Sequence, residues 1–394
     1  MRVALVSSGL VPLPPTKGGA VEEYVYQLAR HLRKLGLDAV AVDAKWNGDS
    51  MEIENINGAE VIKVPVKPPA ISFKKSIIQE FLFGRAVVKT YQGFDILHAN
   101  TVWAGFALAF YRDIKAYRLV YTCHNPLWPE DKVYFGERIV RFIEGHIMRT
   151  SDLTIALNKT MYRAITEKAG VKADKVAIIP NGVDVNFFRP GLRGRDILNE
   201  LKLKEQEYIL FVGRVSPEKG VHLLLKAFKL VVKNVPHNMR LVIVGPLASS
   251  FASKDISSYA ETVKKYAENE LRGRVTFTGP VDRNVLRVLY SNACCLVLPS
   301  LVEAFPMVIL EAMASGTPPV GSTAGGIPEV IVDGVNGLLF KKGNWRDLAN
   351  KILMLIEDRV LRNRLAMNAR KTVEENYDWP VIASRIKEAY TKLI

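Results

Sequence analysis

The sequence predicts an α/β protein with two doubly wound, mainly parallel sheets, one in each of two domains. Short apolar and β-branched segments recur along the 394 residues, and amphipathic segments of helical length lie between them. The apolar segments are continuous rather than alternating, as expected for strands that a parallel sheet buries on both faces. A repeated order of strand, helix and strand is typical of doubly wound sheets. Two successive series of about six such segments therefore predict two domains.

The expected elements follow in chain order. The strands of the first half are expected at 3–7, 39–43, 96–99, 119–123, 153–157 and 176–179, and those of the second half at 209–212, 241–244, 275–277, 295–298, 319–320 and 337–340. The clearest helices are expected at 20–35, 221–235, 257–271 and 345–356. The turn signal Pro180-Asn181-Gly182 separates the two series. We therefore expect domains at 1–190 and 191–376, followed by a segment at 377–394.

Composition sets limits on the class of protein. The chain is 48% hydrophobic and 24% charged, which is typical of globular proteins and excludes a disordered or fibrous one. Three cysteines cannot build a disulfide scaffold, and Cys294 and Cys295 are adjacent in an apolar segment, so a reducing compartment is expected. The first apolar run is too short for a signal peptide, and no stretch approaches the ~20 apolar residues of a membrane span. We expect a cytoplasmic protein.

The charge balance favours anionic partners. Fifty-four Lys and Arg against forty Asp and Glu give a net charge of +14, which fits nucleic acid, an acidic membrane or phosphorylated substrates. The segment 73–91 mixes basic with aromatic and aliphatic residues, which is compatible with peripheral contact with an anionic membrane at its inner face. The commoner alternative is a helix that packs on its own domain. The segment contains Phe73, Lys74, Lys75, Ile77, Ile78, Phe81, Leu82, Phe83, Arg85 and Lys89.

The segment 303–318 carries the most specific pattern. It follows an expected strand and opens a helix whose expected first residue is Pro306, a favoured place for proline. Glu303 lies in the preceding loop and Glu311 about one and a half turns into the helix, so both carboxylates can face one pocket at the helix start. Carboxylates placed there suit hydroxyl-rich ligands. A capping Glu303 and a solvated Glu311 remain equally open on spacing alone.

This segment resembles the E-x7-E signature of family 4 of the retaining glycosyltransferases, which have the GT-B fold of two Rossmann-like domains facing a cleft. The resemblance covers nearly the whole chain and implies an acceptor-binding first domain, a donor-binding second domain and a C-terminal helix that crosses back to the first domain. Four further segments match in the family's order: Asn181-Gly182-Val183-Asp184 with Phe187-Phe188, Phe211-Val212-Gly213-Arg214 with Glu218-Lys219-Gly220, Gly325-Gly326-Ile327-Pro328-Glu329, and Tyr377-Asp378-Trp379.

Arg214 and Lys219 have a clear chemical task in such an enzyme. Transfer from a nucleotide-sugar releases a diphosphate, and two cations at a strand-to-helix turn would stabilise its growing charge. Two solvated surface cations are the alternative. The chain has no Asp-x-Asp motif and no Cys/His cluster with zinc spacing, so we expect no metal requirement and no cofactor beyond the nucleotide-sugar.

The resemblance assigns the remaining roles. Gly18 and Gly19 would meet the donor phosphates, although a flexible loop is equally open on the sequence alone. His124 would contact the donor sugar near its reacting carbon, whereas a lone histidine is more often structural. The acceptor would meet His98, Asn100 and Asn125, and many relatives carry a histidine where this chain has Asn100. Donor contacts are further implied for Val281, Glu303, Phe305, Pro306, Met307, Val308 and Glu311.

The resemblance thus implies a retaining, metal-independent hexosyltransferase. It would move a hexose from a UDP- or GDP-sugar to an acceptor hydroxyl in glycan, glycolipid or glycoconjugate synthesis. A GT-B epimerase or phosphorylase is the nearest alternative. A non-catalytic polyanion-binding protein is a third, but the chain lacks nucleic-acid-binding signatures, and we expect no nucleic-acid partner. The sequence does not specify the base, the sugar, the acceptor or the oligomeric state.

Overall fold

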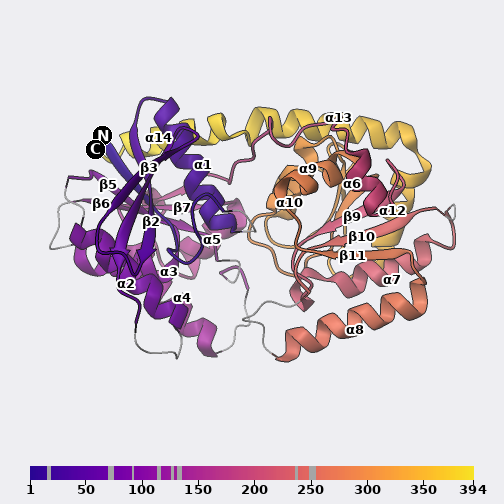
Figure 1. Cartoon of the computed structure of the whole chain (residues 1–394), viewed down its shortest axis with the longest axis horizontal. Coiled ribbons are helices and arrows are strands. Elements are labelled where there is room, and N and C mark those ends of the chain that lie inside the picture. Colours follow the sequence, from indigo (N-terminus) through magenta and orange to yellow (C-terminus); the bar gives the residue numbers. More distant parts are fainter. Residues whose placement is uncertain are drawn as a thin grey trace. The chain divides into compact units, whose positions relative to one another are not determined.

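The computed structural model describes the chain except for residues 16–18, 70–74, 91–92, 113–116, 126–127, 131–134, 236–237 and 248–253. It divides into two compact units (Figure 1). The first unit combines Met1–Gly182 with Trp379–Ile394, and the second is Val183–Asp378. The first domain was expected to end at residue 190, whereas Met1–Gly182 ends eight residues earlier. The last segment, expected from residue 377, joins the first unit from Trp379 onward.

The described strands of the first unit form one sheet. They are β1 (Arg2–Val6), β2 (Asp38–Trp46), β3 (Glu52–Ile56), β4 (Ala59–Val66), β5 (Ile96–Ala99), β6 (Arg118–Cys123), β7 (Leu153–Ala156) and β8 (Val176–Ile178). Their order is β3-β4-β2-β1-β5-β6-β7-β8, and every neighbouring pair is parallel except the hairpin of β3 with β4. The sequence analysis missed β3 and β4. The residues of β3 are exposed or half-buried and those of β4 are buried or half-buried, on either side of a turn at Gly58, and neither strand is one of the continuous apolar runs used to find strands.

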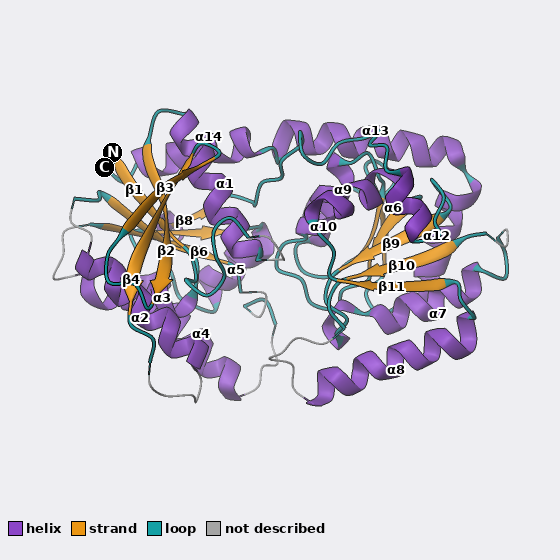
Figure 2. Cartoon of the chain, in the orientation of Figure 1, coloured by secondary structure: helices purple, strands orange, loops and turns teal. Residues whose placement is uncertain are grey.

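Helices cover this sheet on both faces (Figure 2). They are α1 (Ala20–Lys34), α2 (Lys75–Thr90), α3 (Val102–Tyr111), α4 (Phe135–Thr150), α5 (Lys159–Glu167) and α14 (Trp379–Thr391). Helices α2, α3 and α4 lie side by side on one face, with α3 in contact with both neighbours, while α14 packs against α1. The apolar face of α14 buries Ile382, Ala383, Ile386 and Tyr390 completely in the core of this unit.

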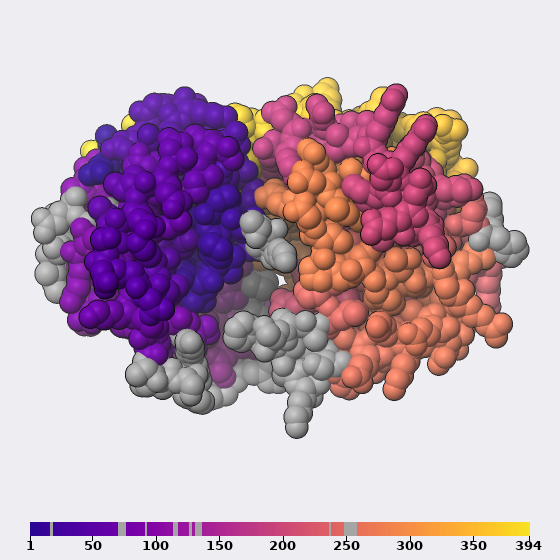
Figure 3. Space-filling model, viewed as in Figure 1, coloured from indigo at the N-terminus to yellow at the C-terminus, as the bar shows by residue number. Residues whose placement is uncertain are grey.

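The second unit has an entirely parallel sheet. Its described strands are β9 (Tyr208–Val212), β10 (Arg240–Val244), β11 (Val275–Gly279), β12 (Cys295–Leu298), β13 (Pro319–Ser322) and β14 (Leu338–Phe340), in the order β11-β10-β9-β12-β13-β14. Its helices are α6 (Arg195–Glu200), α7 (Val221–Val231), α8 (Lys254–Leu271), α9 (Arg283–Asn292), α10 (Met307–Ala314), α11 (Ile327–Val330), α12 (Trp345–Glu357) and α13 (Arg359–Asn376), with a short 3-10 turn, η3 (Pro217–Lys219), before α7. In the space-filling view, orange side chains from the region of α9 and α10 form part of the visible surface of this unit (Figure 3).

Each sheet has one point at which its strand order reverses. The first strand of the first unit, β1, lies between β2 and β5, and the first strand of the second unit, β9, lies between β10 and β12. In doubly wound sheets, ligands bind beyond the carboxyl ends of the strands at such a point. The loops that follow β1, β5, β9 and β12 are therefore where each unit is expected to bind a ligand. None of the described helices is long and apolar enough to span a membrane.

Candidate functional site

The loops after β9 and β12 are locked together in the second unit. The amide of Leu301 donates to the carbonyl of Glu218 at 2.7 Å. Gly220, which opens α7, has a φ of +70°, and a Cβ at this position would lie 2.1 Å from the carbonyl oxygen of Pro299. Only glycine fits this position, because any side chain would strike the backbone of the neighbouring loop. The carboxyl ends of the two central strands thus carry a single loop assembly.

Lys219 and Glu303 meet in this assembly. The Nζ of Lys219 lies 2.8 Å from Oε2 of Glu303, and the hydroxyl of Ser300 donates to the same oxygen at 3.2 Å. The two side chains are 22% and 11% exposed, so water screens the pair less than it would on an open surface. The sequence analysis selected these residues from separate motifs, and the structure brings them together.

Arg214 stands on the same loop in a different environment. Its side chain is half exposed, and its Nη2 lies 4.0 Å from Oε1 of Glu218. A surface ion pair at this distance contributes little to stability. The guanidinium is therefore open to an anion that approaches the carboxyl end of β9.

Helix α10 differs in one detail from the expectation. It begins at Met307, not at Pro306, because Pro306 has a φ of −88° and a ψ of +75°, outside the helical region. Glu311 lies within the helix, and its Oε2 accepts a hydrogen bond from the hydroxyl of Tyr290 on α9 at 2.8 Å. Each glutamate of the motif thus has a hydrogen-bond partner of its own. That the two carboxylates face one pocket stays a prediction. Phe305 and Pro306 are buried, while Met307 and Val308 are half-buried.

Val281 follows β11 and lies half-buried in the loop that leads to α9. The next residue, Asp282, caps α9 by accepting a hydrogen bond from the amide of Asn284 at 2.7 Å. Strand β11 is an edge strand, with β10 between it and β9. Val281 is therefore placed beyond the carboxyl ends of the same sheet as Lys219 and Arg214, two strands away from β9.

In the first unit, the loop after β1 leads into α1 through Gly19. This residue has a left-handed φ of +114°, and a Cβ there would lie 2.9 Å from Oε2 of Glu22. Glu22 itself is buried and accepts a hydrogen bond from the hydroxyl of Ser8 at 2.5 Å. The left-handed backbone therefore favours glycine at position 19. Gly18 lies outside the described residues.

His124 follows β6 and stacks edge-to-face against Tyr24, with 5.1 Å between the ring centroids. Its Nε2 is buried and has no hydrogen-bond partner among the described residues. Burial lowers the pKa of His124 from 6.5 to about 4, so the imidazole is neutral near pH 7. The neighbouring Asn125 donates from Nδ2 to Oε2 of Glu144 at 2.8 Å. The contact of this neutral ring with the donor sugar stays a prediction.

His98, which is expected to meet the acceptor, has a hydrogen-bond partner on each ring nitrogen. It is fully buried, with Nδ1 2.6 Å from the hydroxyl of Tyr390 and Nε2 2.6 Å from Oγ1 of Thr122. Burial, with a smaller effect of His124, lowers its pKa to about 3. Both ring nitrogens are therefore used within the core, and the contact of His98 with the acceptor stays a prediction. Asn100 is also buried and donates to the carbonyls of Val6 and His98, while its Oδ1 has no partner among the described residues.

The sequence analysis overlooked Glu144. This fully buried carboxylate on α4 accepts hydrogen bonds from the hydroxyl of Tyr121 at 2.7 Å, the indole of Trp128 at 2.6 Å and the amide of Asn125. Burial raises its pKa. It fixes the segment around His124 to α4. The signal that could have revealed it is its position on the apolar face of α4, one turn before Met148, where a charge is unexpected.

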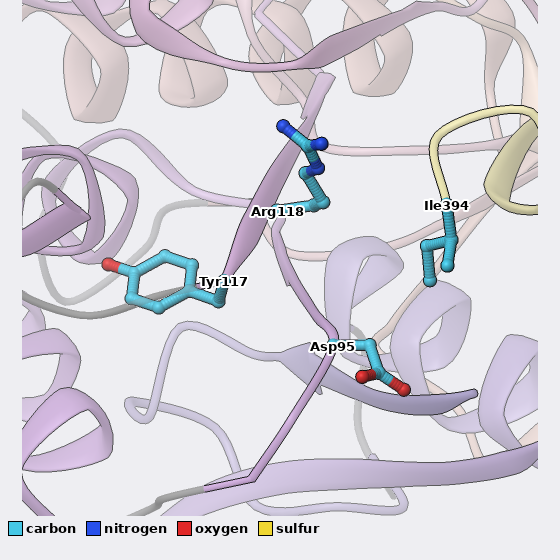
Figure 4. Close-up of a pocket in the computed structure, with 4 residues that line it drawn as sticks. All are labelled: Asp95, Tyr117, Arg118 and Ile394. Carbon is cyan, nitrogen blue, oxygen red and sulfur yellow. The ribbon is translucent and has the colours of Figure 1, made fainter.

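One cavity of about 400 Å³ lies elsewhere, at the amino-terminal ends of β5 and β6 (Figure 4). Asp95, Tyr117, Arg118 and Ile394 line it. It is at the opposite edge of the sheet from His124 and Asn100, so it is separate from the strand ends at which ligands are expected. Among the described residues, no group of three His, Cys, Asp or Glu side chains could hold a metal ion.

Comparison with known proteins identifies the family. A family described as glycosyl transferases group 1 matches residues 195–372, and a family described as glycosyltransferase family 4 matches residues 18–187. The chain is a glycosyltransferase, similar to group 1 in its second unit and to family 4 in its first. Each family thus matches most of one structural unit, and the two together account for most of the chain.

Relatives of this glycosyltransferase match it over their full length. An uncharacterized glycosyltransferase of Methanocaldococcus jannaschii is 27% identical over 402 residues, covering 99% of this chain and 98% of the relative. A D-inositol 3-phosphate glycosyltransferase of Corynebacterium diphtheriae is 25% identical, covering 99% and 94%. Among solved structures, sucrose-phosphate synthase from Thermosynechococcus elongatus has a TM-score of 0.83 at 24% identity, covering 100% and 99% of the two chains. Anabaena HepE in complex with UDP-glucose has a TM-score of 0.76 at 23% identity and full coverage of both. These similarities support the GT-B fold.

Proposed function

We propose that this glycosyltransferase moves a hexose from a nucleotide-diphosphate sugar to an acceptor hydroxyl, with retention of configuration and without a metal ion. The observation that carries the proposal is the pairing of Lys219 with Glu303 beside the exposed Arg214, at the point where the strand order of the second sheet reverses. A diphosphate needs cations and sugar hydroxyls need acceptors. This assembly offers both within one pair of interlocked loops.

The two cations would act on the leaving group. As the glycosidic bond breaks, its electron pair passes to the diphosphate, and negative charge grows on the phosphate oxygens. Arg214 would bind these oxygens as a planar fork and Lys219 as a point charge, at the start of a helix whose free amides also favour anions. Preorganised donors of this kind lower the barrier because they bind the transition state more tightly than the ground state.

The carboxylates and His124 would hold the sugar and the ribose. Both described contacts of the Glu303 carboxylate use Oε2, which leaves Oε1 for a sugar hydroxyl. Glu311 would bind the ribose of the nucleotide. The neutral His124 would hydrogen-bond the sugar without placing a positive charge next to its reacting carbon, where an oxocarbenium-like state develops.

Retention is best explained by attack on the same face as the leaving group. The acceptor oxygen forms the new bond to the anomeric carbon as the bond to the diphosphate breaks. The acceptor proton passes to the departing phosphate oxygen, so no side chain has to serve as the base. A double displacement would instead need a carboxylate nucleophile at the sugar.

The relatives suggest which substrates to test first. HepE was solved with UDP-glucose, and several relatives are named D-inositol 3-phosphate glycosyltransferases. We propose a uridine or guanosine diphosphate hexose as the donor and a hydroxyl of a polar or lipid-linked acceptor as the nucleophile. D-inositol 3-phosphate is the first acceptor to examine.

Thermal shifts with UDP, GDP, ADP and their hexose conjugates test the donor site. A ligand that binds only the folded protein stabilises it by RT ln(1 + [L]/Kd), about 2.7 kcal/mol at a hundredfold excess over Kd. We expect one base to raise the Tm, with no change on adding EDTA and a loss of the shift in Arg214→Ala. Arg364→Ala, which removes an exposed arginine on α13, should keep the shift. Failure of every nucleotide to stabilise the protein would contradict the proposal.

Product analysis then separates the alternatives. With donor and acceptor present, we expect a glycoside whose anomeric configuration in NMR spectra matches that of the donor. Conversion of the nucleotide-sugar without any acceptor would indicate an epimerase. Turnover that requires inorganic phosphate would indicate a phosphorylase.

A further inference from the structure

Helices α3 and α4 of the first unit expose large apolar side chains. Phe142 is 74% exposed, Phe110 is 62% exposed and Ile139 is 46% exposed. Phe142 and Phe110 are the exposed phenylalanines of the part of the chain that the structure describes. Exposing such side chains to water is unfavourable, so a surface that gathers them indicates an interaction.

Ring contacts connect α3 with α4 and α2 within one helical turn of the two exposed phenylalanines. Phe106 on α3 contacts His146 on α4, with 6.3 Å between ring centroids. Phe110 lies one helical turn after Phe106, and Phe142 lies one turn before His146. Helix α2 completes the surface, since its Phe81 contacts Phe106 at 6.1 Å. Figure 2 shows the three helices side by side, and we call their outer surface the α2–α4 face.

The exposed charged side chains that the structure describes on the α2–α4 face are all basic. The cations among the exposed residues described on these helices are Lys89, Arg138 and Arg149, with His146 beside them. None of the exposed residues described on the three helices is an aspartate or glutamate. The three carboxylates of these helices lie inward: Glu80 and Glu144 are buried, and Glu137 is half-buried.

The structure also revises the segment that the sequence analysis selected for membrane contact. Phe83, Val87 and Val88 of α2 are buried, whereas Ile77, Ile78, Phe81 and Leu82 are half-buried and none of them is exposed. Phe73 and Lys74 lie outside the described residues. The apolar side chains available for an interface are instead on α3 and α4, while α2 adds Lys89.

We propose that the α2–α4 face binds an anionic lipid bilayer. Phe110, Ile139 and Phe142 would enter the boundary between headgroups and acyl chains, and Lys89, Arg138 and Arg149 would contact lipid phosphates. Exposed aromatic and aliphatic residues between cations, with no exposed carboxylate, are what an anionic bilayer surface attracts. This inference does not depend on the proposed sugar transfer. It would hold the enzyme at a surface where lipid-linked acceptors are found.

Cosedimentation of the whole protein with vesicles tests the proposal. We expect binding to phosphatidylcholine vesicles that contain phosphatidylglycerol, weakening as salt rises, and no binding to pure phosphatidylcholine. Ile139→Ser with Phe142→Ser should weaken binding about tenfold or more because apolar burial is lost. Lys89→Glu with Arg138→Glu should weaken it by about 25-fold or more, since each basic residue near the surface contributes about fivefold.

Matched variants on α13 serve as controls. Val360 and Met367 are 80% and 68% exposed, and Arg359 and Arg364 are exposed beside them. Val360→Ser with Met367→Ser, and Arg359→Glu with Arg364→Glu, replace the same number of apolar or basic residues on the second unit, with the same change in net charge. They should leave vesicle binding within about twofold of the wild type. Thermal unfolding of every variant verifies that each remains folded.

Three results would overturn the proposal. The first is a wild type that does not bind anionic vesicles at low salt. The second is an equal loss of vesicle binding in the α13 variants, which would mean that binding depends on the overall charge of the protein and not on the α2–α4 face. The third is a wild-type dimer in light scattering that Ile139→Ser with Phe142→Ser converts to a monomer while vesicle binding is unchanged, which would assign the face to a second copy of the chain.

Discussion

At the scale of single residues, the contact between Lys219 and Glu303 carries the most functional weight. Lys219 Nζ lies 2.8 Å from Glu303 Oε2, and the two residues are 84 positions apart in the chain. We predict that Lys219→Ala lowers kcat/KM by about 10²–10³, the usual effect of removing one preorganised donor from a developing anion. Steady-state kinetics with the nucleotide-sugar identified in thermal shifts measures this loss.

Lys351→Ala is a matched control for that substitution. Lys351 is 20% exposed and forms an ion pair with Asp333 at 3.1 Å, but it lies on α12, away from the loops after β9 and β12. We expect kcat/KM to change less than threefold in this variant. Equal losses in both variants would mean that Lys219 acts through the stability of the unit and not on the leaving group.

A second residue-scale prediction concerns pH. Burial lowers the pKa of His98 from 6.5 to about 3, so the folded state binds fewer protons than the unfolded state between these values. The contribution of neutral His98 to the free energy of unfolding is complete above pH 6.5 and is lost as the pH falls. We predict that His98→Gln flattens the decrease in unfolding free energy between about pH 6 and about pH 4, by up to ~1.4 kcal/mol per pH unit.

Urea unfolding at several pH values measures this slope. His146→Gln is the comparison variant, because it makes the same substitution at an exposed histidine on α4. The buried carboxylates Asp43, Glu80 and Glu144, whose pKa values are raised by burial, titrate in both proteins and cancel in the comparison. An unchanged slope in His98→Gln would contradict the prediction.

At the scale of elements, the sequence could predict what local composition determines. The fully buried strands β9 and β12 are continuous apolar runs, so their positions were predicted correctly. The hairpin of β3 and β4 escaped because neither of its strands is a continuous buried apolar run. The burial of His98 between two hydrogen-bond partners could not be predicted from the sequence either, since one of them, Tyr390, is 292 residues away. Sequence motifs selected Lys219 and Glu303, but only the fold brings the two side chains together.

The element that holds the candidate site together is the turn from β9 into α7. Gly220 has a φ of +70° and would place a Cβ 2.1 Å from the carbonyl oxygen of Pro299, while Gly36 has a φ of +82° with open space around it. Both Ala variants carry the strain of a left-handed backbone, about 1–2 kcal/mol. We predict that Gly220→Ala lowers the unfolding free energy by at least ~1 kcal/mol more than Gly36→Ala, and abolishes the nucleotide-induced rise in Tm.

This comparison separates the effect of backbone strain at the substituted glycine from the effect of displacing the loop at Pro299. The loop that Gly220→Ala would push away carries Glu303, so both stability and nucleotide binding should suffer. Gly36→Ala should lower stability and leave the nucleotide shift intact. Equal losses in the two variants, with the nucleotide shift kept in both, would show that the close approach to Pro299 has no role in forming the site.

At the scale of the whole molecule, the two units differ in how the chain builds them. The second unit is one continuous segment, Val183–Asp378, whereas the first needs α14 from the end of the chain. Helix α14 buries Trp379 and Tyr390 in the core of the first unit, and the hydroxyl of Tyr390 is the partner of His98 Nδ1. Residues 1–182 alone would leave an apolar face of α1 uncovered and His98 Nδ1 without its partner Tyr390, and both are destabilising.

We therefore predict that residues 183–378 fold cooperatively as a separate fragment, whereas residues 1–182 do not. A Cβ on Gly182 would lie 2.6 Å from the indole of Trp379, so the two ends of the missing connection are adjacent, and a short Gly-Ser linker from Gly182 to Trp379 should restore folding. Near-UV circular dichroism and urea unfolding of the three fragments measure this. Cooperative unfolding of 1–182 without α14 would contradict the assigned role of the helix. If the fragment 183–378 also shows the nucleotide-induced rise in Tm, and loses it in Arg214→Ala, the donor site is complete within the second unit.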